Sequence, residues 1–166
     1  MPLYRKKNYL TLSFWHIDAM IDAKDSKILA ELVADGRKPI VVIADRVGLP
    51  RATVQERLRK MVKSGVIRKF VAIPDYSKIG KQVTAYVFVA FGAEGRLSQR
   101  KLAEEISRTP GVYEVSVISG GWDMLLKVRA NSVEEIGNLV VDRLRSMSGV
   151  EKTETCVSFQ TIKESF

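Results

Sequence analysis

The chain has 166 residues, with 27 Lys or Arg against 19 Asp or Glu, so its formal net charge is +8. Hydrophobic residues make up 46% and charged residues 28%, which excludes a disordered polymer and a membrane protein. The one cysteine, Cys156, rules out an internal disulfide, and the one histidine, His16, rules out a His-rich metal site and a His-dependent catalytic triad. These features predict a basic intracellular protein with no metal, no cofactor and no enzymatic activity.

The positive charge is concentrated in the first half of the chain. Residues 1–82 hold 17 basic and 8 acidic residues, a net of +9, whereas residues 83–166 hold 10 and 11, a net of −1. Only the first half is therefore expected to attract a polyanion. The boundary falls in a polar stretch, and the composition predicts an extension over 1–20, a domain over 21–73, a linker over 74–82 and a domain over 83–166.

The first domain is expected to begin with two short helices. Asp25 is predicted to cap the first helix, which ends near Gly36. Pro39 suits the first turn of the second helix, and Gly48 suits its end. Apolar residues recur at helical spacing and predict the buried faces, which are Ile28, Leu29, Leu32 and Val33 in the first helix and Ile40, Ile43, Ala44 and Val47 in the second.

A third helix is expected from Pro50 or Arg51 to Ser64. Two β-prone pairs, at residues 66–67 and 70–71, come after it. Three short helices followed by a β-prone tail are typical of a winged helix-turn-helix domain. The apolar stripe that faces the core of this domain from the third helix is Val54, Leu58 and Met61.

The opposite face of the third helix carries side chains suited to reading DNA. Arginine can grip guanine, glutamine can grip adenine, and lysine neutralises phosphate. Between residues 46 and 69 there are eight basic residues and one acidic residue. The candidates near bases are Arg51, Thr53, Gln55, Glu56 and Arg59, and those near phosphates or in structural pairs are Arg46, Arg57, Lys60 and Lys63.

Glu56 is the exception on this face because its carboxylate would repel phosphate. It is expected to accept from cytosine, to pair with a neighbouring arginine, or to stay outside the groove. A solvated basic helix is the alternative interpretation of the whole segment. The spacing of three helices favours double-stranded DNA as the partner.

The second domain alternates β and α segments in the order βαββαβ. That order predicts a ferredoxin-like fold, an α+β sandwich with its helices on one face. Ser132 and Glu135 are expected to form a capping box for the second helix, and Cys156 is expected to be buried. The other expected elements are strands over Val83–Phe91, Val112–Ile118, Met124–Arg129 and Val150–Gln160 and a helix over Ser98–Arg108.

The first strand of this domain is apolar on both faces. One face can lie against the helices, and the other then needs a cover. A second copy of the same sheet is the expected cover, so the pattern predicts a homodimer. The two alternating sets are Val83, Ala85, Val87, Val89 and Phe91 on one side and Tyr86, Phe88 and Ala90 on the other.

Two sets of short runs carry a resemblance to a known family. The first set is Ile21-Asp22, Ile28-Leu29, Asp35-Gly36-Arg37, Val47-Gly48-Leu49, Arg57-Leu58 and Gly65-Val66-Ile67. The second set is Ser119-Gly120-Gly121-Trp122-Asp123 and Gly149-Val150-Glu151-Lys152-Thr153-Glu154-Thr155. In this order they resemble the DNA-binding and effector domains of the Lrp/AsnC, or feast/famine, transcription regulators. The chain departs from the family at Pro50, at Trp122 and in its long leader, which is expected to pack on a partner subunit or to touch DNA.

The resemblance implies a regulator whose assembly or DNA affinity responds to an amino acid or a related metabolite. It also implies dimers joined through the effector-domain sheets, octamers of four dimers, and a cytoplasmic, nucleoid-associated protein. An architectural DNA-binding protein of low specificity and a stand-alone metabolite sensor are the alternative functions.

The effector would lie between effector domains, at residues that have an ordinary structural interpretation as well. An Asp carboxylate can pair with an α-ammonium, and glycine amides and Thr hydroxyls can hold an α-carboxylate. A tight turn would also explain the glycine-rich run, and β-propensity would explain the threonines. Carried onto this chain, the implied site is Ser119, Gly120, Gly121, Trp122, Asp123, Thr153 and Thr155.

Overall fold

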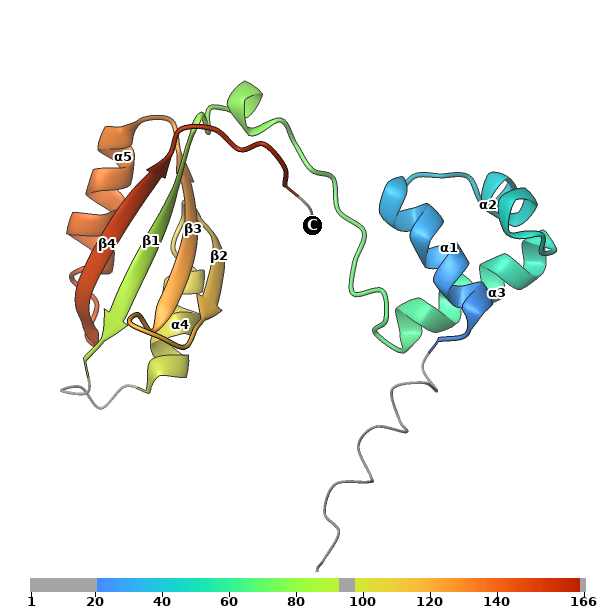
Figure 1. Ribbon diagram of the computed structural model, residues 1–166, viewed down its shortest axis with the longest axis horizontal. Helices are drawn as coiled ribbons and strands as arrows, with labels where there is room; N and C mark the ends of the chain where they lie inside the picture. Colours follow the sequence, from blue (N-terminus) through green and yellow to red (C-terminus); the bar gives the residue numbers. More distant parts are fainter. Residues whose placement is uncertain (1–20, 93–97, 165–166) are drawn as a thin grey trace, which may run out of the picture. The chain divides into compact units, whose positions relative to one another are not determined.

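The computed structural model describes residues 21–92 and 98–164. The predicted extension over residues 1–20, with His16, lies outside the described residues. The chain divides into two compact units between Ile73 and Pro74 (Figure 1). Among the described residues, no helix combines the length and the apolar character needed to cross a membrane.

Unit 1 contains three helices, α1 (Ala23–Ala34), α2 (Ile40–Val47) and α3 (Arg51–Lys63). Gly48 ends α2 in the left-handed conformation, with φ of 67°, as the sequence predicts. Its left-handed turn leads through Leu49 and Pro50 into α3, which makes the helix-turn-helix. The buried core is Ile28, Leu32, Ile43, Ala44, Val54, Met61 and Ile67.

The start of α1 differs from the sequence-based expectation. Asp22 is the N-cap, and its carboxylate accepts from the backbone N–H groups of Lys24 and Asp25, each at 2.8 Å. Asp25 completes a capping box by accepting from the Asp22 N–H at 3.1 Å. The prediction of Asp25 as the N-cap was wrong, because Asp22 occupies the N-cap position and Asp25 is the third residue of the helix in the same capping box. Val33 is also 74% exposed, since only the Ile28–Leu32 stripe faces the core.

The β-prone pairs after α3 form no strand in the structure. Residues 68–75 have neither helix nor strand, and Phe70, Val71 and Ile73 are exposed. A strand needs a second strand to satisfy its backbone groups, and the described part of unit 1 offers helices alone.

Unit 2 is one four-stranded antiparallel sheet with its helices on one face (Figure 1). The spatial order is β2-β3-β1-β4, the ferredoxin-like order that the sequence predicts. A short 3₁₀-helix, η1 (Tyr76–Ile79), precedes the sheet. The other elements are β1 (Val83–Phe91), α4 (Gln99–Ser107), β2 (Val112–Val117), β3 (Met124–Ala130), α5 (Val133–Asn138), the π-helix η2 (Leu139–Leu144) and β4 (Val150–Ser158).

The start of α5 departs from the predicted capping box. Ser132 Oγ accepts from the Glu135 N–H at 3.2 Å, as expected. The Glu135 carboxylate, however, accepts from the N–H of Asn131 at 2.9 Å rather than from that of Ser132. Helical spacing predicts Val133, Ile136, Val140 and Leu144 on one face; the last three are buried against the sheet, but Val133 is 58% exposed.

Alternation along β1 separates two faces of the sheet. Val87 and Val89 are fully buried against the helices, whereas Tyr86 and Phe88 are half-buried on the opposite side. We call this opposite side the open face; it carries Tyr86, Phe88 and Ala90 of β1, Leu125, Lys127 and Arg129 of β3, and Lys152, Glu154 and Cys156 of β4. Cys156 pairs with Tyr86 on the open face and is exposed, so its predicted burial was wrong.

Candidate nucleic-acid interface and effector site

The face of α3 that points away from the core of unit 1 presents the predicted DNA-reading residues. Val54 and Met61 are buried, which fixes the opposite face of the helix toward solvent. Pro50 precedes the helix without a side-chain cap, as the sequence predicts. Arg51, Gln55, Arg59, Lys60 and Lys63 are exposed, and Thr53, Glu56 and Arg57 are half-buried.

Glu56 pairs with Arg59, one of the three possibilities expected from the sequence. The Arg59 Nη2 to Glu56 Oε2 distance is 2.6 Å, and the two residues are one helical turn apart. Arg59 is 77% exposed, so the pair contributes little to stability. Its consequence is local, because Glu56 offsets the charge of Arg59 and orients its guanidinium.

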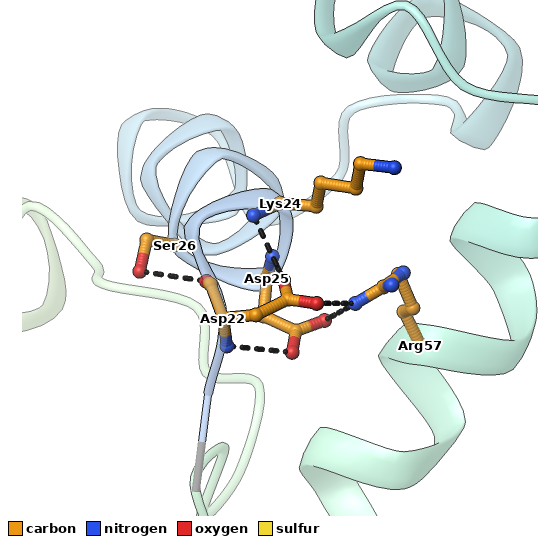
Figure 2. A network of polar contacts seen from close by, with 5 residues as sticks. All are labelled: Asp22, Lys24, Asp25, Ser26 and Arg57. Atoms are coloured by element: carbon orange, nitrogen blue, oxygen red, sulfur yellow. Dashed lines mark hydrogen bonds and ion pairs between the residues drawn. The ribbon is translucent and has the colours of Figure 1, made fainter. Parts of the chain in front are cut away.

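Arg57 joins α3 to the start of α1. Its Nη1 donates to Asp22 Oδ2 at 2.6 Å and to Asp25 Oδ1 at 2.9 Å, the two carboxylates of the capping box (Figure 2). These two hydrogen bonds raise the pKa of the Arg57 guanidinium. The Asp25 N–H and the Arg57 guanidinium in turn lower the pKa of the Asp22 carboxyl. Arg57 therefore holds two helices together at the site where the sequence placed a DNA contact or a structural pair.

Arg46 is partly engaged through Glu31 of α1. Its Nη1 lies 3.0 Å from Glu31 Oε2, which also accepts from Lys38 Nζ at 2.5 Å. The Lys38 hydrogen bond is the main cause of the lowered pKa of Glu31, and Arg46 adds to it. Arg46 keeps 58% of its side chain exposed, so most of its donors face solvent.

Three cations of α3 have no such partner. Within residues 21–92 and 98–164, the side chains of Arg51, Lys60 and Lys63 make no ion pair and no hydrogen bond. Lys60 also lines a hollow of about 650 Å³ on the flank of α3, together with Thr53 and Glu56. This face thus offers unpaired cations, a hydroxyl and an oriented guanidinium, the groups that bind phosphates and base edges.

Asp123 occupies a structural position at the base of the β2–β3 hairpin. Its Oδ2 accepts from the Phe91 N–H at 2.8 Å, and its Oδ1 accepts from Gln99 Nε2 at 3.2 Å. A carboxylate has about four acceptor positions, so half of its capacity is used. Ser119, Gly120 and Gly121 are exposed at the hairpin, and the φ of 133° at Gly120 favours glycine.

The remaining predicted effector residues lie on both faces of the sheet. The Trp122 ring is 6.0 Å from the Phe88 ring on the open face, with Lys152 Nζ 5.3 Å from its centroid. Thr153 pairs with the buried Val89 and accepts from Arg145 Nε at 2.9 Å on the helix-covered face. Thr155 shares that face and is exposed at the sheet edge. One copy of the chain therefore does not bring Trp122 and the two threonines into one pocket.

Sequence reasoning missed two groups of unit 2. Gln99 of α4 supports Asp123 from 24 residues away, and Arg145, the C-cap of η2, supports Thr153 from 8 residues away. Arg129 is a buried cation of β3, and the alternation of Lys127 and Arg129 with buried Leu126 and Val128 was the available signal.

The comparisons with known proteins cover both units. Residues 21–68 match the model of a winged helix-turn-helix DNA-binding domain, and residues 84–166 match that of the Lrp/AsnC ligand binding domain.

Individual proteins with both units are also similar over most of their length. An HTH-type transcriptional regulator of Pyrococcus horikoshii is 43% identical over 145 residues, which is 87% of this chain and 97% of that protein. The crystal structure of an AsnC family regulator from Agrobacterium tumefaciens is 27% identical, with a TM-score of 0.81, over 87% of this chain and 94% of that one. A Neisseria meningitidis transcriptional regulator solved as an L-Met complex shares the fold, with a TM-score of 0.81 at 24% identity over 87% and 94%. The chain belongs to the Lrp/AsnC family, whose members are DNA-binding transcription regulators with a ligand-binding domain and not enzymes.

Proposed function

We propose that this protein is a sequence-specific regulator that reads a roughly palindromic operator with α3 and is modulated by an amino acid or a related metabolite. The exposed face of α3 carries this proposal. Arg51, Lys60 and Lys63 have no ion-pair partner in the described part of the chain, and Arg59 is already oriented by Glu56. In a helix-turn-helix protein such a face enters the major groove, with half-sites about one helical turn or a multiple apart.

The role that we propose for each residue of this face depends on whether its side chain is free or already bound in an ion pair. Arg51, Thr53, Gln55 and Arg59 are the base-reading residues, and Glu56 acts by orienting Arg59. Lys60 and Lys63 contact phosphates, and Arg46 does so with the donors that Glu31 leaves free. Arg57 acts indirectly, since its guanidinium is bound by Asp22 and Asp25.

The open face supports assembly as a homodimer. Among the described residues of unit 2, no helix covers its apolar side chains, which include Tyr86, Phe88 and Leu125. A second sheet of the same kind would bury them, and two copies place two α3 helices on one palindrome. Four such dimers would form the octamer that the family resemblance implies. A regulator that binds the chromosome in this way would be located in the cytoplasm, at the nucleoid.

The effector site is proposed at the β2–β3 hairpin, completed by a second copy. The exposed amides of Gly120 and Gly121 can hold a carboxylate, and the two acceptor positions left on Asp123 can hold an ammonium. Because Trp122 and Thr153 face opposite sides of one sheet, a ligand that touches both sets needs residues from two copies.

A competition binding assay tests the regulatory function. Labelled DNA from upstream of the protein's own gene is titrated at physiological salt against unlabelled DNA of scrambled sequence. A specific regulator should prefer its operator by about 10³-fold or more. Equal competition by the scrambled DNA would contradict the proposal and favour the architectural alternative.

A thermal-shift screen of the twenty amino acids, L-Met among them, tests the effector. A ligand present at 100 times its Kd should stabilise the protein by about 2.7 kcal/mol. The same screen on Gly120→Val tests the site: the space around Gly120 is free, but its φ of 133° strains any side chain, so the hairpin amides should move and the ligand-induced shift should fall. An unchanged Tm for all twenty would remove amino acids as the effector class.

A further inference from the structure

Arg129 of β3 is the centre of a cluster at one end of the open face. It is 3% exposed, and its guanidinium carbon lies 3.5 Å from the centroid of the Tyr76 ring and 5.1 Å from that of Tyr113. Its Nη2 donates to both carboxylate oxygens of Glu164, at 2.5 and 2.7 Å. The two tyrosine rings meet edge to face at 5.2 Å. We call Tyr76, Tyr113, Arg129 and Glu164 the clasp.

The clasp draws together segments that are distant in the sequence. Tyr76 belongs to η1, directly after the division between the units, and Glu164 lies on the tail after β4, which has no helix or strand. Glu164 also pairs with Lys127, so one carboxylate of the tail neutralises two cations of β3. An arginine between an aromatic ring and a carboxylate is held on two sides. The tail therefore helps to keep η1 on the sheet.

This attachment shortens the free segment that joins the two units. Ile67 is the last buried residue of unit 1, residues 68–75 are exposed, with no helix or strand, and Tyr76 is the next half-buried residue. With the clasp closed, the eight residues 68–75 are free and reach at most about 27 Å when extended. If η1 leaves the sheet, the fifteen residues 68–82 are free up to β1 and reach about 50 Å.

We propose that the clasp sets the length of this tether and thereby determines which half-site spacings the regulator accepts. The inference rests on the proposed operator binding by a dimer. Once one unit 1 has bound its half-site, the tether sets the effective concentration of the other at the second half-site. That concentration falls roughly as the −3/2 power of tether length, so lengthening from eight to fifteen residues lowers it about 2.5-fold.

Two variants open the clasp in different ways. Glu164→Gln removes the carboxylate with little change in shape, and Tyr76→Leu removes the aromatic face over Arg129. Glu104→Gln is the matched control, because Glu104 is exposed on α4 and its side chain makes no hydrogen bond or ion pair within residues 21–92 and 98–164. The first readout needs no DNA. Hydrogen exchange at the Lys81 amide, which bonds to the Tyr76 carbonyl at 2.9 Å, should accelerate in both clasp variants and not in the control.

The second readout is binding to paired half-sites whose spacing varies by single base pairs around one helical turn. Both clasp variants should bind the preferred spacing two- to threefold more weakly, penalise shifted spacings less than wild type does, and bind a single half-site equally well. Unchanged exchange at Lys81, or faster exchange with an unchanged spacing profile, would overturn the inference. Wild-type protein that prefers no DNA would refute the proposed function instead, and the exchange result would still decide whether the clasp holds η1.

Discussion

Arg57 and Arg129 are both structural arginines, but the surfaces around them differ. Around Arg57 in unit 1, the neighbouring cations Lys60 and Lys63 stay exposed and unpaired within the described residues. Around Arg129 in unit 2, Lys127 is drawn into the same cluster, where burial and Arg129 lower its pKa. The half-chain charges of +9 and −1 set the overall contrast. Exposed cations occur in both units, Arg100 and Lys101 of α4 among them, but α3 carries Arg51, Lys60 and Lys63, unpaired within the described residues, on the second helix of a helix-turn-helix.

The strongest test of the comparison is to put a charge in the apolar middle of the open face. Phe88→Arg places a charge in the middle of the open face, beside Trp122. Glu154 of β4 lies directly across from position 88 and can pair with the new arginine, but burying this ion pair between two sheets costs desolvation and displaces an aromatic contact, so the dimer dissociation constant should rise by at least about 100-fold. Sedimentation velocity measures it, and Val141→Arg, at an exposed position of η2, is the control that should leave the dimer intact. An unchanged dimer in Phe88→Arg would place the interface elsewhere.

Arg59 tests whether the free face of α3 reads bases. Arg59→Ala should reduce discrimination at one operator position by about 5- to 150-fold and leave other positions unchanged. Binding to a panel of single-base operator variants measures it. Glu56→Gln is the matched variant, since it releases Arg59 from its 2.6 Å ion pair without removing it. Equal loss of preference at every position would show that Arg59 contacts only the backbone.

Variants of Lys63 and Arg57 compare a free cation with an ion-paired one on the same helix. Lys63→Ala should lower the slope of log affinity against log salt by about 0.9, the value for one phosphate contact. Arg57→Met should leave that slope unchanged and lower the Tm of unit 1, because Asp22 and Asp25 lose their shared partner. Binding titrations at several salt concentrations and thermal melts distinguish the two. A slope change in Arg57→Met as large as that in Lys63→Ala would make Arg57 a phosphate contact.

Regular patterns in the sequence predicted the architecture well. The β-prone apolar run over residues 83–91 predicted the bounds of β1, and Gly48 marked the end of α2. The order of the β and α segments, which predicted the ferredoxin-like fold, followed from such local signals, and the family followed from a resemblance in short sequence runs; both are confirmed. The prediction of β-structure after α3 was wrong, because a strand forms only when a second strand pairs with it, and a local sequence pattern does not show whether that second strand is present.

The site residues were harder to predict because their roles depend on distant partners. A helical wheel shows that Arg57 lies off the core stripe, but not that Asp22, 35 residues earlier, holds it. Asp123 is likewise engaged by Gln99 of α4, 24 residues earlier, and Thr153 by Arg145 at the end of η2. The role of Arg129 depends on Glu164 of the tail. Sequence spacing identifies which side chains reach the surface, whereas tertiary pairing decides which of them are free to bind.

The smallest expected effect is the pH dependence of stability that comes from Asp22, one of the two carboxylates paired with Arg57. The folded-state pKa of Asp22 lies below its ordinary value of 3.8, so protonating it favours the unfolded chain. Its stabilisation of unit 1 is complete above about pH 5 and is lost as the pH falls through 3.8 toward the folded pKa. Asp22→Asn keeps a capping side chain and removes the charge. The variant should melt a few degrees lower at neutral pH at most, because the pair is solvent-exposed, and the difference should vanish near pH 3. A Tm difference that persists undiminished at that pH would assign the effect to capping geometry rather than to the ion pair with Arg57.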